Sequence, residues 1–360
     1  MREAAETWNR EAPLLARLRK TSRGGAAVFW TLVNGGITTG TFNESDDVVE
    51  AENTYDDRKM LSLLRSGKRA AFRLSHDAIA STISSDPNVT ADALVNLFGF
   101  EYLGHLAQLG RDIELALAMG TGSTTSVSTG SPAQDIVGLV TALQSTTYAG
   151  QTVSANKGLQ AVINTGTGTL TKKQIDGDLA QLKVNAGGIT PNWIMTTPIT
   201  AAHAFLPLVD QNVRNVSQNG GNPPYNLGTS SNPTNWIVQY TVNGIPVIEN
   251  SAWSIPTAAF PTGLDGYYVM GRDEDLEVDV LNYGMIGNPL PDASTEEQAQ
   301  LVQGAGALGG TYNLQKLGIP ALTYSLGKTG SSIRFAMETK LQLVIKRMNT
   351  FALRSGITTS

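Results

Sequence analysis

The feature that most constrains the fold of this chain is a predicted helix of thirty residues, 90–119. Thr90 suits the N-cap position, and Gly120 follows the last predicted turn as a C-terminal stop. Apolar residues recur every three or four positions, which is typical of one buried helix face: Leu94, Leu97, Phe98, Tyr102, Leu106, Leu109, Ile113, Ala116 and Leu117. At 1.5 Å per residue the helix is roughly 45 Å long, which is longer than a small domain is wide.

Two blocks of opposite charge precede this helix. Seven acids and no base lie between Thr41 and Asp57: Glu44, Asp46, Asp47, Glu50, Glu52, Asp56 and Asp57. Six bases and no acid follow between Arg58 and Arg73: Arg58, Lys59, Arg65, Lys68, Arg69 and Arg73. Two interpretations stay open. Either the blocks are solvated faces, or they are the arms of a long protruding hairpin that meets complementary charges on neighbouring copies.

The composition suggests a chain whose surface is largely covered. The 360 residues correspond to about two domains, and 41% are hydrophobic, which argues against disorder. Only 16% are charged, against about 25% in average soluble domains. There are also 37 glycines and 15 prolines, so loops are plentiful. A large assembly would explain the low charge, because its subunits bury surface against one another.

Several function classes are excluded or disfavoured. The chain has no cysteine, which excludes disulfides, thiolate metal sites and cysteine nucleophiles. His76, His105 and His203 lack metal-ligand spacing. The net charge is -5, whereas a general nucleic-acid binder is more often basic. We find no signal-peptide core and no membrane-spanning stretch, and we expect a soluble, intracellular protein without a cofactor or metal.

Three motifs resemble catalytic or binding sites. Residues 304–309 match G-x-G-x-x-G, but no acid follows before Glu338, so we expect a flexible loop. Gly327-Lys328-Thr329 lacks the first glycine of a phosphate loop and indicates a hairpin turn. An alternating acidic run could bind calcium or face arginines, and we favour an arginine-facing or solvated strand because the EF-hand glycine and glutamate are absent: Asp273, Asp275, Glu277 and Asp279. We see no acid–base pair and predict that the chain is not an enzyme.

The remaining pattern predicts a mixed α+β chain. Strands are expected at 26–33, with a turn at 34–36 and a further strand at 37–42, and later at 192–196, 266–270 and 275–280. A hairpin is expected at 236–249 around Asn243-Gly244, and the apolar tail 333–353 predicts long strands. Helices are expected at 77–84, 134–145 and 171–183, and another is expected to begin at Pro198.

In this order the elements resemble those of the major capsid protein of tailed double-stranded-DNA phages, the Hong Kong 97 type. Three segments carry the likeness. Arg73-Leu-Ser-His-Asp-Ala-Ile-Ala, with the helix that ends at Met119-Gly-Thr-Gly, resembles the family's spine helix and its exit. Residues 242–250 resemble the axial-domain hairpin, and residues 340–353 resemble the closing strand of the peripheral domain.

The resemblance implies a shell subunit with five regions. These are an N-terminal arm (1–27) that reaches another copy, an extended loop (28–75), a peripheral domain (76–190) with its spine helix, an axial domain (191–321) and closing peripheral strands (322–360). It also implies hexamers and pentamers around DNA that is bound without sequence specificity. Portal, scaffold and cement or decoration proteins are the implied partners, and the implied location is the virion, after assembly in the host cytoplasm. No membrane partner is implied.

The predicted contacts between subunits are the charged residues of the extended loop. They are Glu44, Asp46, Asp47, Glu50, Asp56, Asp57, Arg58, Lys59, Arg65, Lys68 and Arg69. Two alternatives remain. An encapsulin-type compartment would share the fold and enclose protein cargo. A β-rich enzyme would need a catalytic pocket, for which the acidic run 273–279 is the only candidate.

Overall fold

The structure is a computed structural model that describes residues 12–23, 25–33, 58–81, 87–122, 135–208, 238–281, 322–329 and 332–359. Its dominant element is α4 (Pro87–Met119), a helix of 33 residues that begins three residues before the predicted start. The short helix α3 (His76–Ser81) precedes it, close to where a short helix is predicted. The long-helix prediction is therefore confirmed.

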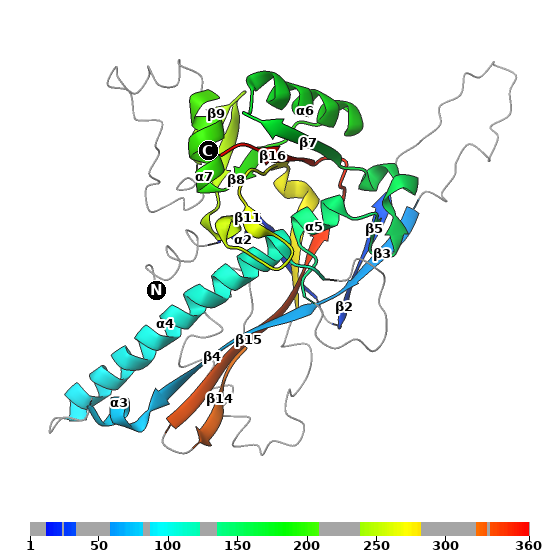
Figure 1. Cartoon of the computed structure of the whole chain (residues 1–360). Coiled ribbons are helices and arrows are strands. Elements are labelled where there is room, and N and C mark those ends of the chain that lie inside the picture. The colour runs from blue at the N-terminus through cyan, green and yellow to red at the C-terminus, as the bar shows by residue number, and fades with distance from the viewer. Residues whose placement is uncertain are drawn as a thin grey trace, which may run out of the picture.

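A five-stranded sheet lies along α4. It contains β1 (Arg19–Arg23), β13 (Leu276–Leu281), β15 (Ser332–Ile345) and β14 (Leu322–Thr329) in that order, and β4 (Ser66–Ser75) pairs with β15. The strands β4, β14 and β15 extend away from the rest of the molecule beside α4 (Figure 1). We call these three strands the wing. Phe72 of β4 stacks on His105 of α4 at 5.4 Å, so one face of the wing packs under the helix.

A six-stranded sheet forms the more compact part of the molecule. Its order is β7 (Val162–Gly168), β16 (Ala352–Ile357), β12 (Tyr268–Gly271), β8 (Trp193–Thr196), β10 (Ile245–Glu249) and β9 (Val238–Val242). The predicted turn between β9 and β10 is present, with φ of 54° at Asn243 and 75° at Gly244. Both values suit this residue pair in a tight hairpin. The apolar side chains of all six strands contribute to two buried clusters.

Helices and short turns connect and cover these sheets. Thr171 caps α6 (Lys172–Asn185) in a capping box with Gln174, close to the predicted start. The helix predicted at 134–145 is the shorter α5 (Leu139–Gln144). Other elements are α2 (Pro13–Arg17), β5 (Thr147–Tyr148), β6 (Gln151–Thr152), η3 (Val153–Ala155), η4 (Lys157–Leu159), α7 (Pro198–Thr200), η5 (Ala201–Phe205), η6 (Leu206–Leu208), η8 (Ser251–Ser254), β11 (Pro261–Leu264) and η9 (Asp273–Asp275).

The sheets divide the chain differently from the predicted domain bounds. β16 belongs to the six-stranded sheet, although 322–360 is predicted to close the peripheral domain. β13 lies within 191–321 but pairs with β15 and β1 in the other sheet. The reason is that β15 ends at Ile345 and the chain then crosses to a new sheet, and a run of apolar strands does not reveal which partner each strand takes.

The described part of the N-terminal arm packs on its own chain. β1 pairs in parallel with β13, with Arg19 opposite Glu277 and Arg23 opposite Leu281. Leu14, Leu15 and Leu18 are buried in the main core. Within one chain, residues 12–23 therefore pack on their own sheet and core, and contact of the arm with another copy stays a prediction.

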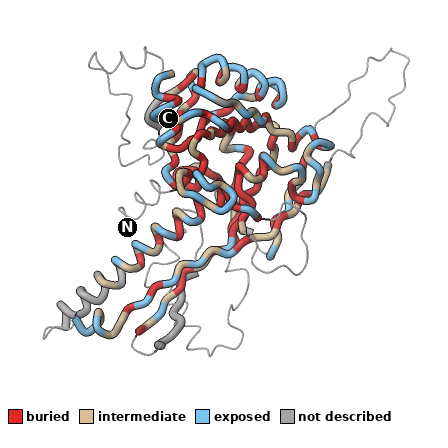
Figure 2. Tube along the Cα trace, viewed as in Figure 1, coloured by how far each residue is buried: buried red, intermediate tan, exposed pale blue. Residues whose placement is uncertain are grey.

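Burial differs between the two parts of the molecule (Figure 2). Buried residues are dense around the six-stranded sheet, where Trp193 and Phe351 lie 6.2 Å apart between ring centroids. Along β4, buried and exposed residues alternate, as expected for a sheet covered on one face. None of the helices among the described residues combines the length and the apolar character needed to cross a membrane.

Candidate subunit-contact surfaces

The acidic run before and within β13 is neutralised by its own chain. Asp273 pairs with Arg17 at 2.9 Å and Asp275 with Arg347 at 2.9 Å. Glu277 pairs with Lys346 at 2.8 Å, and Asp279 pairs with Arg65. The three acids from Asp275 onward are buried, so each needs its cation to offset lost hydration. The arginine-facing interpretation is confirmed, and the described residues contain no cluster of side chains suited to a metal ion.

Arg65 is a fold-stabilising residue rather than an exposed contact. Its side chain is 1% exposed, and its guanidinium pairs with Asp279, which also accepts a hydrogen bond from the Thr21 hydroxyl at 3.2 Å. The backbone N–H of Arg65 donates to Ala26 O at 3.0 Å. Because this residue separates β3 (Arg58–Leu64) from β4, the ion pair ties that junction to β13. Contact of Arg65 with a neighbouring subunit stays a prediction, and within this chain its side chain is buried against Asp279.

Two other predicted contact residues also have partners within the chain. Lys68 pairs with Asp135 at 2.7 Å, and both side chains are partly exposed. Arg69 pairs with Glu338 at 2.7 Å and stays 61% exposed. These acids lie far along the sequence, so counting charges within the basic block does not reveal them. Lys68 and Arg69 remain accessible at the surface, but they are not unpaired cations.

The basic block begins in a two-stranded stem. β2 (Ala27–Val33) pairs antiparallel with β3, from Ala27 opposite Leu64 to Val33 opposite Arg58. The acidic block therefore joins the two strands of this stem, and Arg58 and Lys59 stand at the start of β3. The predicted contacts Glu44, Asp46, Asp47, Glu50, Asp56 and Asp57 lie outside the described residues, as do the predicted turn at 34–36 and strand at 37–42.

The stem has one buried and one exposed face. Val28, Leu32, Leu61 and Leu63 are buried in the core or close to it. On the opposite face, Phe29 is 55% exposed and Met60 is 71% exposed. Sequence reasoning predicted the strand at 26–33 but treated residues 58–64 only by their charge, and it missed the exposed pair Phe29 and Met60. The alternation of apolar residues along β3 was the signal available.

The exposed face of the wing is basic. Cross-strand partners share a face of the sheet, and Arg73 is opposite Arg334 while Lys340 is opposite Gly67. All three cations are exposed and form no hydrogen bond or ion pair with the described residues. The basic block pointed to Arg73, whereas Arg334 and Lys340 were missed because they are isolated in the sequence.

A buried carboxylate fastens the N-terminal segment to α4. Glu114 accepts the backbone N–H groups of Leu14 at 2.8 Å and Leu15 at 2.9 Å, and a hydrogen bond from Asn250 Nδ2. These donors and nearby Lys20 favour the charged carboxylate, but burial outweighs them and raises the pKa of Glu114 to about 7. One side chain thus connects α2, α4 and the segment after β10.

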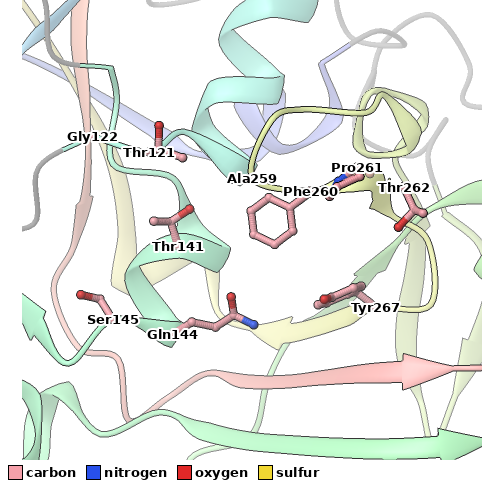
Figure 3. Close-up of a pocket in the computed structure, with 11 residues that line it drawn as sticks. Thr121, Gly122, Thr141, Gln144, Ser145, Ala259, Phe260, Pro261, Thr262 and Tyr267 are labelled. Carbon is pink, nitrogen blue, oxygen red and sulfur yellow. The ribbon is translucent and has the colours of Figure 1, made fainter.

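Two neighbouring cavities of the described residues differ in the chemistry of their linings: the smaller includes Lys68, Asp112 and Asp135, whereas the larger has no charged side chain. One cavity, of about 590 Å³, is lined by Thr121 and Gly122 just after α4, by residues of α5 and by residues 259–263. Figure 3 shows the Phe260 ring in its centre, with Thr141 and Gln144 on one side and Thr262 and Tyr267 on the other. Its lining includes no carboxylate, histidine, lysine or arginine, and so lacks the usual acid–base groups. A neighbouring cavity of about 350 Å³ shares Thr121 and Ala259 with it.

The described residues give no support to either of the two nucleotide-binding motifs considered in the sequence. Residues 304–309 lie outside the described residues. Gly327-Lys328-Thr329 lies at the end of β14, which pairs antiparallel with β15, so a strand follows where a phosphate loop needs a helix. The three residues lie in the strand rather than in the predicted turn, while the antiparallel pairing of β14 with β15 agrees with a hairpin at this place in the chain.

Comparison with solved structures identifies the fold. Over 96% of this chain, and 92% of the other, the structure is similar to a chain of the cyanophage A-1(L) capsid asymmetric unit, with 15% identity and a TM-score of 0.63. A second match is the holo-SrpI encapsulin complex from Synechococcus elongatus PCC 7942, with 10% identity over 96% of this chain and 88% of the other and a TM-score of 0.50. No protein-family model and no curated protein matches the sequence. The chain has the Hong Kong 97-type capsid fold, as predicted.

Proposed function

We propose that this chain is the structural subunit of an icosahedral phage head, in which it forms hexamers and pentamers that enclose double-stranded DNA. The observation that carries the proposal is the likeness to a phage capsid chain over 96% of the sequence. The low charge content supports it, because a shell subunit buries surface against many copies. We further propose that the subunit performs no catalysis.

We propose that each of the two large sheets forms the centre of one domain of the shell subunit. A peripheral domain consists of α4 and the five-stranded sheet, and an axial domain consists of the six-stranded sheet with α6. Residues 34–57, which join the two strands of the stem, and the N-terminal arm are the segments proposed to contact neighbouring copies. The exposed Phe29 and Met60 would be covered in that contact.

The proposed partners follow from a phage head. They are a portal, a scaffold, and cement or decoration proteins, with assembly in the host cytoplasm and a final location in the virion. Packaged DNA would be held without sequence specificity. The net charge of -5 supports weak adhesion, because affinity for DNA depends largely on lysine and arginine contacts to phosphate.

The experiment is to express the chain with and without the scaffold of its phage, and to examine the products by sedimentation and negative-stain microscopy. We expect closed shells of uniform size. A chain that stays monomeric under all conditions, with the scaffold present, would contradict the proposal.

An encapsulin-type compartment is the second candidate, supported by the match at a TM-score of 0.50. The two functions differ in what the shell contains. Particles from the native source that hold nuclease-protected DNA would support the phage head. Particles that hold a protein cargo and no DNA would support the compartment.

A further inference from the structure

The cavity drawn in Figure 3 combines aromatic rings with neutral hydrogen-bonding groups. Phe260 and Tyr267 meet edge to face, with ring centroids 6.3 Å apart and an interplanar angle of 87°. Most of the other side chains that line it carry a hydroxyl or an amide group: Thr121, Thr141, Gln144, Ser145 and Thr262. Small ligands usually bind in concave sites of about 300–1,000 Å³ that offer aromatic walls and a few polar groups. At about 590 Å³, this cavity has the size and the lining of such a site.

The wall that carries Phe260 is held in place by its own backbone. Phe260 O accepts the backbone N–H groups of Thr257 and Gly263, each at 2.9 Å, and Phe260 N–H donates to Thr257 Oγ1 at 3.1 Å. Gly263 has a φ of 65°, and an added Cβ there would lie 2.6 Å from the carbonyl oxygen of the buried Trp253. The turn therefore packs directly on the core. A cavity that is formed before its ligand arrives loses little conformational entropy on binding.

Several polar groups at this cavity have no partner among the described residues. The Gln144 amide and the Tyr267 hydroxyl form no hydrogen bond with them, and Gln144 extends from α5 toward Tyr267 (Figure 3). Thr141 Oγ1 is buried in the wall and also lacks a partner there, which is rare in native structures. The Ser145 hydroxyl, in contrast, already donates to Thr147 O at 2.6 Å. Gln144 and Tyr267 are thus available to a ligand that has donors and acceptors of its own.

The lining also restricts the charge of the ligand. No acidic, basic or histidine side chain is among the described residues that line the cavity. In the adjoining cavity, Lys68 and Asp135 pair with each other at 2.7 Å and lie beside Asp112. A phosphate or carboxylate would therefore lose its hydration without gaining a free cation. A purely apolar ligand would instead cover Gln144 and Tyr267 without pairing them. The lining suits a neutral molecule with an apolar face and several hydroxyl groups.

We propose that this cavity binds a neutral saccharide. A pyranose ring has an apolar face of C–H groups, which would lie against the Phe260 ring. Its hydroxyl groups both donate and accept, so they would pair with the Gln144 amide and the Tyr267 hydroxyl. The inference goes beyond the proposed function, because assembly of a shell does not require a bound sugar.

The first experiment measures binding of three neutral disaccharides to the full-length chain as purified. The probes are maltose, cellobiose and N,N′-diacetylchitobiose. Saturation-transfer NMR detects binding and calorimetry measures Kd. We expect at least one disaccharide to bind, with the strongest transfer to the C–H protons of one ring face, since these would contact Phe260. Absence of transfer to all three at millimolar concentration would overturn the proposal.

The second experiment locates the sugar with variants of the lining. We expect F260A to raise Kd by about tenfold or more, because it removes the apolar contact. Q144A and Y267F should each raise Kd by about three- to tenfold, because each removes one hydrogen-bonding group. Y267F keeps the aromatic ring, so its result does not depend on whether F260A folds. The control is F100A, at a phenylalanine that is 78% exposed on α4, and it should leave Kd unchanged. Binding that F260A, Q144A and Y267F all retain would place the sugar elsewhere and overturn the proposal.

Uridine is the competing ligand, because a nucleobase also stacks on aromatic side chains. If uridine binds with the same losses in Q144A and Y267F while none of the disaccharides binds, the cavity takes a nucleoside and the saccharide proposal is wrong. The measurement needs no assembled shells. A chain that fails to form shells would therefore contradict the proposed function and leave the saccharide result to be read on its own.

Discussion

The six-stranded sheet and the wing differ in whether their arginines are buried and paired within the chain. In the sheet, Arg354 of β16 is 8% exposed and donates through Nε to Asp178 of α6 at 2.7 Å. Asp178 also accepts from Tyr268 and from Asn164 Nδ2, the latter at 2.7 Å. On the wing, Arg73 and Arg334 are exposed and form no ion pair or hydrogen bond with any residue that the structure describes. The first arrangement fastens a helix to a sheet, and the second leaves charge available for another molecule.

This contrast shows why charge alone does not identify a contact surface. Arg65 belongs to the predicted basic arm, yet it is buried against Asp279 like Arg354 against Asp178. Arg334 stands outside the basic block, yet it lies on the exposed wing face. Removing a buried partner leaves an uncompensated charge, while an exposed cation costs the fold little. Substitutions in the buried ion pairs should therefore lower the free energy of unfolding far more than substitutions of the exposed arginines.

The largest expected effect is at the Asp178 network. D178A leaves Arg354 and Tyr268 without their buried acceptor, and we expect the free energy of unfolding to fall by about 3–5 kcal/mol. Denaturant unfolding of the subunit measures it, with K173A on the exposed side of α6 as the control. If D178A lowers the free energy of unfolding by less than about 1 kcal/mol, the buried network contributes no more than an exposed ion pair does, and the proposed difference between the two regions is wrong.

A pH effect of similar size is expected from Glu114. Its pKa is raised from 4.5 to about 7 by burial, so the native state holds its proton more tightly than the unfolded chain does. The Glu114 contribution is therefore complete below pH 4.5 and is lost as pH rises through about 7, by up to roughly 3 kcal/mol.

Unfolding of the subunit across this pH range measures the loss. The variant E114Q, which cannot ionise, should show less of it. If the unmodified chain and E114Q showed the same pH dependence of unfolding, Glu114 would not be the source of that dependence. Hydrogen exchange at the amides of Leu14 and Leu15 locates the effect at α2, since both amides donate to this carboxylate.

A smaller effect is expected at the start of α6. Thr171 accepts a hydrogen bond from the backbone N–H of Gln174 at 3.4 Å and completes the capping box. T171A should lower the free energy of unfolding by about 1 kcal/mol, whereas T171S should keep most of it. Equal losses in both variants would mean that the hydroxyl is not what stabilises the helix start.

The smallest effect on folding is expected on the wing. R73A and R334A remove exposed cations that repel each other, so the free energy of unfolding should change by no more than about 0.5 kcal/mol, and a slight gain fits the repulsion. The same denaturant titrations measure it. A loss of 2 kcal/mol in either variant would show that the fold depends on these arginines, and the contrast with Arg354 would disappear.

The sequence alone determined the local elements and the fold class. Gly120 marks the end of the long helix and Asn243-Gly244 marks the hairpin, because stop and turn chemistry depend on a few adjacent residues. The predicted cap Thr90 was wrong, since the helix already begins at Pro87. The order of these elements was enough to identify the resemblance that the structural comparison confirms. The acidic run was correctly expected to face arginines.

Only the tertiary structure decided which charges remain available and which strands share a sheet. Arg65 and Asp279 are 214 residues apart, and Arg69 and Glu338 are 269 apart, so neither pair has a local signal. The tail likewise predicts strands without showing that β16 crosses to the six-stranded sheet. The physical reason is that helix caps and turns are interactions between sequence neighbours. Burial and ion pairing depend instead on contacts that exist only after distant segments have come together.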